Sequence, residues 1–146
     1  MQEKLAVLLY FESIIVNSQI SNRLINSVFM TLLVKMLKAI KTPLVRVRLC
    51  ASLGLLIRHS TVIDNEVAES EVCTVLCEVL TRETNDKVRR KAVAALGEFM
   101  FYAATQLDDE QADQCWEIRD EAVNAIIKSL RVEPAGSESP NSATGG

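Results

Sequence analysis

The sequence predicts an all-α protein in which a pair of helices is repeated along the chain. The stretch Val45–Ile57, VRVRLCASLGLLI, returns at Val88–Met100 as VRRKAVAALGEFM, with Gly54 and Gly97 at matching places 43 residues apart. A period of about 40–47 residues is typical of HEAT and armadillo arrays. Only 5% of the residues are aromatic, and glycine and proline are sparse, which favours aliphatic helix packing over a β-sandwich. We therefore expect a HEAT/armadillo-like right-handed α-solenoid fragment of about six helices.

The N-terminal half of the chain is expected to form three helices. The first covers Gln2–Val16, and its apolar residues run almost all round, so it needs burial on more than one side. The second runs near Asn22–Ile40, where apolar residues recur at four-residue spacing. The third covers about Pro43–Arg58, with Thr42 as its cap and proline at the first helical position, where the missing N–H has no partner to lose. The apolar contacts expected here are Leu5, Leu8, Leu9, Phe11, Ile15, Leu24, Val28, Phe29, Leu32, Leu33, Met36, Leu37, Ile40, Val45, Leu49, Leu53, Leu56 and Ile57.

The C-terminal half is expected to add three more helices. Asp64 caps a fourth helix at about Asn65–Arg82, and a turn at Thr84 to Asp86 leads into a fifth at about Lys87–Thr105. A sixth helix ends near Arg131. The apolar contacts expected here are Val72, Val75, Leu76, Val79, Leu80, Val88, Ala92, Leu96, Phe99, Met100, Ala103, Trp116, Val123, Ile126, Ile127 and Leu130.

Residues 1–131 are predicted to form one domain of helical repeats, followed by a disordered tail at residues 132–146. After Val132 the chain holds no apolar residue larger than alanine, so it cannot bury enough surface to offset the entropy of ordering. The array begins and ends on half repeats, and the apolar first helix lacks the polar outer face of a terminal unit. We therefore expect a segment or short isoform of a longer array, open to self-association or to packing on further repeats.

The two repeated glycines lie inside predicted helices, where glycine costs about 1 kcal/mol relative to alanine. Because Gly54 and Gly97 occupy the same place in each copy, they predict a close approach of helices at the same point of each repeat.

Charge and composition exclude several classes of function. The formal net charge is −3 and the pI about 5.2, whereas a general nucleic-acid binder needs an excess of positive charge. No apolar run reaches the length of about 18–20 residues needed to cross a bilayer. We expect neither nucleic acid nor a membrane among the partners of this chain.

No group of residues assembles an active site. The sequence has no glycine-rich phosphate loop, and its one histidine, His59, has no second histidine with which to form a metal site or a proton relay. Cys73 and Cys77 share a helix face but supply only two of the four ligands that zinc wants, so the four cysteines are read as free thiols. We expect no enzyme activity, no cofactor and no metal.

A basic cluster is the best polar candidate for a partner-binding surface. It consists of Arg46, Arg48, Arg89, Arg90 and Lys91. In the repeat register the first arginine matches Arg89 and the second matches Lys91, so the charges stack as a ladder along the solenoid. Either these cations pair with turn acids or lie solvated, or they form a groove for an acidic protein partner.

An aromatic cluster is the second candidate. Phe99, Phe101 and Tyr102 cannot all face one core stripe of a helix. At least one of them is expected at the surface, where Phe101 or Tyr102 either anchors a partner or contacts the edge of the next repeat.

Two segments resemble the helical-repeat region of the Unc-51-like kinase 4 family of Fused-related proteins. They are LGLLIRHSTVIDNEVAES at Leu53–Ser70 and DKVRRKAVAALGEFMFYAATQ at Asp86–Gln106, and the likeness covers about Leu44–Gln106. Such proteins join an N-terminal kinase or pseudokinase domain to a C-terminal HEAT/armadillo array. The resemblance implies a scaffolding segment with microtubule, ciliary or neuronal roles. ATP would bind in the kinase domain of such a protein, which this chain lacks.

Our functional prediction is a non-catalytic protein-interaction scaffold in the cytoplasm. A cytoskeletal or ciliary location is what the resemblance implies, and the identity of the protein partners stays open. The alternative is an intramolecular regulatory or dimerisation segment of a serine/threonine kinase-like protein.

Overall fold

The computed structural model describes residues 1–16, 23–109 and 114–131. The regular secondary structure in these residues is all helical, as predicted. The predicted tail at residues 132–146 lies outside the described residues. Within the described part of the chain there is no strand. Its elements are α1 (Gln2–Val16), α2 (Arg23–Ala39), α3 (Pro43–His59), the π-helical segment η1 (Val67–Cys73), α4 (Thr74–Arg82), α5 (Asp86–Leu107) and α6 (Asp120–Arg131).

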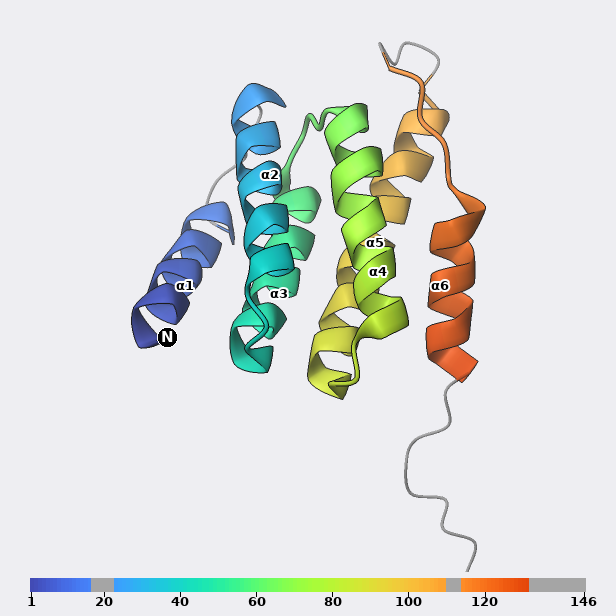
Figure 1. The fold of residues 1–146 in the computed structure, drawn as a ribbon. Helices are drawn as coiled ribbons and strands as arrows, with labels where there is room; N and C mark the ends of the chain where they lie inside the picture. The colour runs from blue at the N-terminus through green and yellow to red at the C-terminus, as the bar shows by residue number, and fades with distance from the viewer. Residues whose placement is uncertain (17–22, 110–113, 132–146) are drawn as a thin grey trace, which may run out of the picture.

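The helices lie in two layers (Figure 1). One layer holds α1, α3 and α5, in which α3 packs on both neighbours. The other holds α2, η1 with α4, and α6. Short turns join α2 to α3 and α4 to α5, so each pair forms an antiparallel hairpin. These two hairpins are the two copies of the 43-residue sequence repeat.

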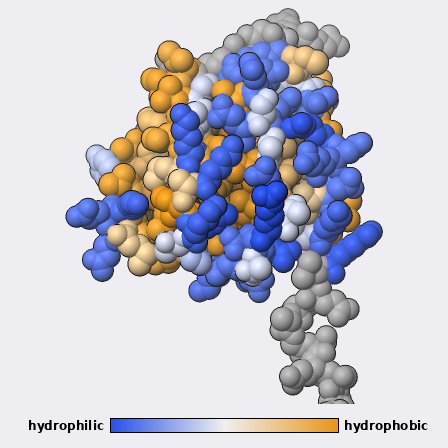
Figure 2. Space-filling model, viewed as in Figure 1, coloured by the Kyte–Doolittle hydropathy of each residue, from blue (hydrophilic) through white to orange (hydrophobic). Residues whose placement is uncertain are grey.

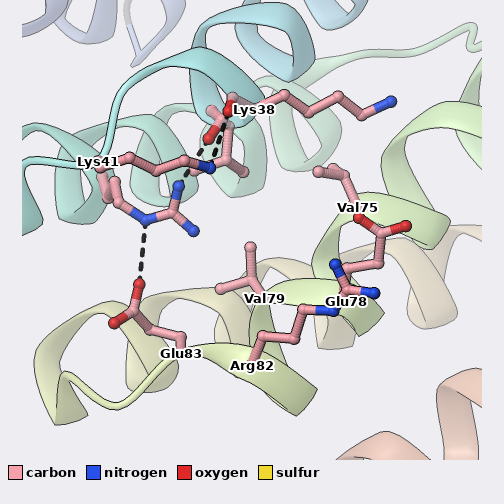
Figure 3. Close-up of a pocket in the computed structure, with 9 residues that line it drawn as sticks. Lys38, Lys41, Val75, Glu78, Val79, Arg82 and Glu83 are labelled. Carbon is pink, nitrogen blue, oxygen red and sulfur yellow. Dashed lines mark hydrogen bonds and ion pairs between the residues drawn. The ribbon is translucent and has the colours of Figure 1, made fainter.

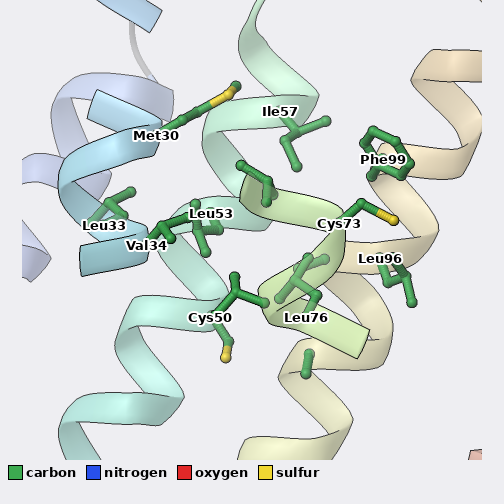
Figure 4. Packing of buried hydrophobic residues seen from close by; sticks show 14 of the residues in the cluster. Met30, Leu33, Val34, Cys50, Leu53, Ile57, Cys73, Leu76, Leu96 and Phe99 are labelled. Carbon is green, nitrogen blue, oxygen red and sulfur yellow. The ribbon is translucent and has the colours of Figure 1, made fainter. Parts of the chain in front are cut away.

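The hydrophobic core fills the space between the two layers. Figure 4 shows α2, α3, α4 and α5 meeting through side chains that are almost completely buried. Removing each such leucine-sized side chain from water stabilises the fold by about 1.5–3 kcal/mol. The residues labelled there are Met30, Leu33, Val34, Cys50, Leu53, Ile57, Cys73, Leu76, Leu96 and Phe99.

A side chain caps the start of the helix at two of the three positions where the sequence predicts a helix to begin. The Oδ1 atom of Asp64 accepts a hydrogen bond from the Val67 N–H at 3.2 Å, so the predicted cap is confirmed. Asn85 caps α5 by accepting hydrogen bonds from the second and third following N–H groups. Thr42 stands at the N-cap position of α3, but its side chain accepts no capping hydrogen bond, so that part of the prediction is wrong. Pro43 begins the helix as predicted.

The predicted fourth helix is divided by η1. A π-helical turn is wider than an α-helical one and shifts the backbone hydrogen bonds by one residue. The carbonyl of Glu69 in this segment accepts a hydrogen bond from Nη1 of Arg119 at 3.1 Å, and its carboxylate accepts one from the Glu117 N–H at 3.1 Å. These bonds fix the extended segment before α6 against η1.

Several residues predicted as core contacts lie in solvent. Leu24, Val28 and Leu32 are 73%, 58% and 52% exposed, because α2 packs on α3 and η1 with its opposite side. Leu9 on α1 and Leu130 on α6 are also exposed. A four-residue apolar stripe marks one face of a helix, but this helix carries two apolar faces, and only one of them finds a neighbour.

Trp116 precedes the sixth helix and is not part of it. It lies in the extended segment before α6, is 5% exposed, and packs edge-on against Tyr102 at a ring-centroid distance of 5.2 Å. The tryptophan therefore seals the gap between α5 and the chain that leads to α6.

Candidate functional site

Arg46, the first member of the predicted basic ladder, is buried and serves the fold. Its Nη1 atom donates hydrogen bonds to the carbonyl oxygens of Leu37 at 2.6 Å and Ile40 at 3.0 Å, which end α2. Its Nε atom donates to Oε2 of Glu83 at 3.0 Å. The guanidinium thus caps one helix and ties it to the turn between α4 and α5 (Figure 3).

Glu83 is held as a carboxylate by its neighbours. Its Oε1 atom accepts hydrogen bonds from the backbone N–H groups of Asn85 at 2.9 Å and Thr84 at 3.0 Å. The Asn85 N–H, together with the guanidinium of Arg46, lowers the pKa of the Glu83 carboxyl below its ordinary value. This carboxylate offsets the charge of Arg46, so neither charge is free to attract a partner.

The other basic candidates are more accessible. Arg48 contacts the carboxylate of Glu12 at 3.7 Å, and its side chain is 42% exposed. Arg89 is half-buried, whereas Arg90 and Lys91 are exposed. Among the residues that the structure describes, no carboxylate forms an ion pair with the last three.

The two aromatic candidates have different surroundings. Tyr102 is half-buried, and its hydroxyl oxygen accepts a hydrogen bond from the Ile63 N–H at 3.0 Å, so it ties α5 to the segment after α3. Phe101 is 70% exposed and lies beside a cavity of about 400 Å³ between α3 and α5. Only the phenylalanine is presented to solvent.

Five residues on one side of α5 form an exposed surface, which we call the α5 stripe. They are Arg90, Lys91, Ala94, Gly97 and Phe101. Arg90, Ala94, Gly97 and Phe101 follow three- and four-residue spacing and share one face of the helix, and Lys91 lies at the edge of that face. The two cations lie toward the start of α5 and the aromatic ring lies about 16 Å further along the axis, from the rise per residue of an α-helix. Small residues leave the middle of the stripe flat.

The repeat register explains what this face does in the preceding hairpin. Gly54 of α3 packs against α5, where an added Cβ would come within 3.2 Å of the Ala95 Cα atom. Gly97 occupies the matching position on α5, and an added Cβ there would meet nothing within 4 Å. The predicted close helix approach is therefore confirmed at the first glycine and absent at the second, because no described helix covers that side of α5.

A second exposed surface covers α1 and α2 at the other end of the molecule. Figure 2 shows apolar side chains gathered toward this end, whereas charged side chains dominate the middle. We call it the apolar end face. It consists of Val7, Tyr10, Ile14, Leu24, Ile25, Val28 and Leu32, each 43–73% exposed. Contiguous apolar surface of this kind usually marks a packing or interaction site.

A basic groove between α2 and α4 went unrecognised in the sequence. It has a volume of about 410 Å³, and its edge carries Lys38, Lys41 and Arg82. These residues are scattered along the chain and follow no repeat, so only the packing of α2 beside α4 brings them together.

The described residues show no cluster of three or more histidine, cysteine, aspartate and glutamate side chains that could hold a metal ion. None of the described helices combines the length and apolarity that a membrane span requires. Cys50, Cys73 and Cys77 are buried free thiols, and Cys115 is an exposed one.

Comparison with known proteins relates the chain to kinase-like proteins. It is 42% identical to the serine/threonine-protein kinase RUNKEL of Arabidopsis thaliana over 106 residues, which are 73% of this chain and 8% of that protein. It is 24% identical to the serine/threonine-protein kinase ULK4 of Mus musculus over 133 residues, 90% of this chain and 10% of that protein. The chain thus spans a tenth or less of the length of these relatives.

The other two comparisons give no match. No family model matches the chain, and no solved structure shows significant similarity to it. The resemblance to kinase-like proteins is therefore supported over part of the chain, and the part that matches is helical, with no kinase fold in the residues that the structure describes.

Proposed function

We propose that this chain is a HEAT/armadillo-like right-handed solenoid segment that acts as a non-catalytic protein-interaction scaffold in a kinase-like protein. The 43-residue repeat coincides with the two helical hairpins, and the hairpins stack side by side in two layers. RUNKEL and ULK4 are named as serine/threonine-protein kinases and are about ten times longer than the segment that matches this chain. These findings support a repeat segment that lies apart from the catalytic part of such a protein.

The α5 stripe is the observation that carries the scaffold proposal. The matching face of α3 packs against another helix through Gly54, whereas the face around Gly97 is open. The stripe therefore presents a helix-packing surface without an occupant among the described residues. The cations at one end would attract an acidic group of a partner, and Phe101 would bury its ring on binding.

Arg89 lies next to this surface on α5, and Arg48 lies on α3 of the same layer, where it contacts Glu12 of α1. Both side chains are partly accessible, so they remain candidates for partner contacts. Arg46 and Tyr102 would contribute indirectly, since each holds together elements that support the α3 and α5 layer.

The scaffold proposal is tested by comparing the proteins that the intact chain captures in proximity labelling. Combining Lys91→Glu with Phe101→Ala should remove specific partners, and Gly97→Leu should do so by filling the flat part of the stripe. Lys35→Glu, an exposed lysine on α2 in the other layer, is the matched control and should leave the partners unchanged. If both stripe variants retain every partner that the control retains, the stripe is not a binding surface.

The alternative function, an intramolecular regulatory or dimerisation segment, is favoured by the apolar end face. A face of this composition is more easily explained by packing on other helices of a larger kinase-like protein, or on a second copy, than by contact with water.

Light scattering after size-exclusion chromatography, with binding of a dye that detects apolar surface, tests this alternative. The isolated chain should associate as its concentration rises and should bind the dye. Replacing Val28 and Leu32 with glutamate should reduce both effects without loss of helicity, because both side chains are solvent-exposed. A monodisperse wild-type monomer with little dye binding would remove the basis of the idea.

No catalytic activity is proposed for these residues. ATP turnover that survives strict purification of the chain would contradict this. We expect a cytoplasmic location, and the cytoskeletal or ciliary role implied by the family resemblance stays a prediction.

A further inference from the structure

The groove between α2 and α4 has an apolar floor and an ion pair at its edge. Leu37, Val75 and Val79 line it and are at most 4% exposed. The ion pair between Arg46 and Glu83 lies at its edge and joins the end of α2 to the turn after α4 (Figure 3). A cleft of about 410 Å³ is within the usual size range of sites that bind small ligands.

The accessible charges around this groove are mostly positive. Lys38 comes from the last turn of α2, Lys41 from the turn that follows it, and Arg82 from the last turn of α4. Glu83 offsets Arg46, so Glu78 is the one remaining carboxylate on the lining. The groove is thus locally basic in a chain whose formal net charge is −3.

Local helix stability accounts for only part of this arrangement. Cations in the last turn of a helix favour its dipole, and the Lys41 ammonium donates a hydrogen bond to the Lys38 carbonyl at 2.9 Å. The side chain of Lys38, however, extends away from Lys41 along the groove (Figure 3). Within the described residues, neither lysine nor Arg82 forms an ion pair with a carboxylate.

We infer that this groove binds an acidic peptide segment through an aliphatic side chain flanked by carboxylates. The aliphatic side chain would cover the apolar floor formed by Leu37, Val75 and Val79. The flanking carboxylates would meet Lys38 and Lys41 on one side and Arg82 on the other. The Arg46–Glu83 ion pair keeps the two walls at a fixed separation, so the site is formed before the peptide arrives.

A nucleic acid fits this groove less well than an acidic peptide. A polyanion gains affinity from many phosphate contacts along an extended basic surface. Here three accessible cations surround an apolar floor, and Glu78 lies among them. The groove also lies on the layer of α2 and α4, apart from the α5 stripe, so it is a separate site from the one in the proposed function.

The experiment uses the whole chain and a fluorescein-labelled peptide of sequence Glu-Glu-Leu-Glu-Glu, with anisotropy as the readout. Wild type should bind it, and Lys38→Glu combined with Arg82→Glu should weaken binding by about tenfold or more. Lys4→Glu combined with Arg58→Glu, two exposed residues on the other layer, is the control with the same charge change and should alter affinity by less than about twofold. Circular dichroism of each variant checks its folding.

Two further peptides and one direct measurement complete the test. Replacing the peptide's leucine with glycine, or its glutamates with lysines, should each abolish most of the binding. Chemical-shift changes on titrating the wild type should concentrate on the methyl groups of Leu37, Val75 and Val79, which locates the site without any variant.

Absence of binding by the wild type would overturn the inference. So would equal loss in both double variants, or methyl shifts confined to α3 and α5. Stronger competition by a single-stranded oligonucleotide than by the peptide would assign the groove to nucleic acid. The groove variants should lose peptide binding but should still capture partners through the α5 stripe. The two measurements therefore test the groove and the proposed scaffold function separately.

Discussion

Arg46 shows how one side chain can join two neighbouring repeats. Its guanidinium caps two carbonyl groups at the end of α2 and forms an ion pair with Glu83 in the turn between α4 and α5. Planar geometry and several fixed donors suit arginine to this task better than lysine. The sequence showed a basic ladder, but the burial of its first member separates Arg46 from the accessible cations.

Replacing Arg46 with methionine should lower the free energy of unfolding by about 2–4 kcal/mol, because two helix-end carbonyls and a carboxylate lose a buried charged donor. Arg46→Lys should recover part of this loss, since the charge remains but the forked contacts do not. Urea denaturation measures both. A loss below about 1 kcal/mol in the methionine variant would mean that water replaces the guanidinium without penalty.

Glu83 should make stability depend on acid pH. Its pKa is lowered in the folded state, so its contribution to stability is present above the unfolded pKa, about 4.3, and is lost as the pH falls through the folded value. The stability difference between wild type and Glu83→Gln should therefore be constant from neutral pH to about pH 5 and shrink below it. Urea denaturation at a series of pH values checks this. A difference that is the same at every pH would contradict the assignment.

At the scale of elements, residues at matching positions of the two repeats differ in whether another helix packs against them. Gly54 on α3 faces the backbone of α5, whereas Gly97 on α5 faces open space. The same division is seen along α2, which buries one apolar face and exposes another. Sequence periodicity defines such faces, but the number of helices packed alongside decides which of them is buried.

The two glycines should respond oppositely to a larger side chain. Gly54→Leu forces a side chain against the Ala95 backbone and should destabilise the fold by about 1–3 kcal/mol. A Cβ at position 97 has nothing within 4 Å, so Gly97→Leu should stabilise α5 by about 0.5–1 kcal/mol through helix propensity. Thermal and urea unfolding of the pair measure this. Equal destabilisation of both variants would show that the open side of α5 is covered in solution.

At the scale of the whole molecule, two layers of helices enclose one core, and no described helix covers either end of the stack. The apolar end face lies at the α1 and α2 end, and the α5 stripe lies on α5, at the opposite end of the layer formed by α1, α3 and α5. Because each hairpin contacts only its neighbours, stability depends on how many units are stacked together. The three buried cysteines lie within this shared core, and burial raises the pKa of the Cys50 thiol to about 12.

Thiol reactivity should report on the integrity of this core. With a dithiobis(nitrobenzoic acid) reagent at neutral pH, exposed Cys115 should react quickly, while Cys50, Cys73 and Cys77 should react only as the fold opens. Denaturant should convert all of them to fast reaction together. More than one fast thiol in the native chain would indicate that the layers open locally.

The sequence by itself determined the helical class, the 43-residue period and most helix bounds, since these depend on local propensity, capping and apolar spacing. It also identified Phe101, Arg90 and Lys91 as candidates, and the structure places all of them in solvent. It could not separate Arg46 from the accessible cations, divide the fourth helix at η1, or find the groove beside α2 and α4. Those outcomes depend on which helices lie next to one another. Burial, ion pairing and the convergence of distant side chains are properties of the packed layers, so only the tertiary structure decided them.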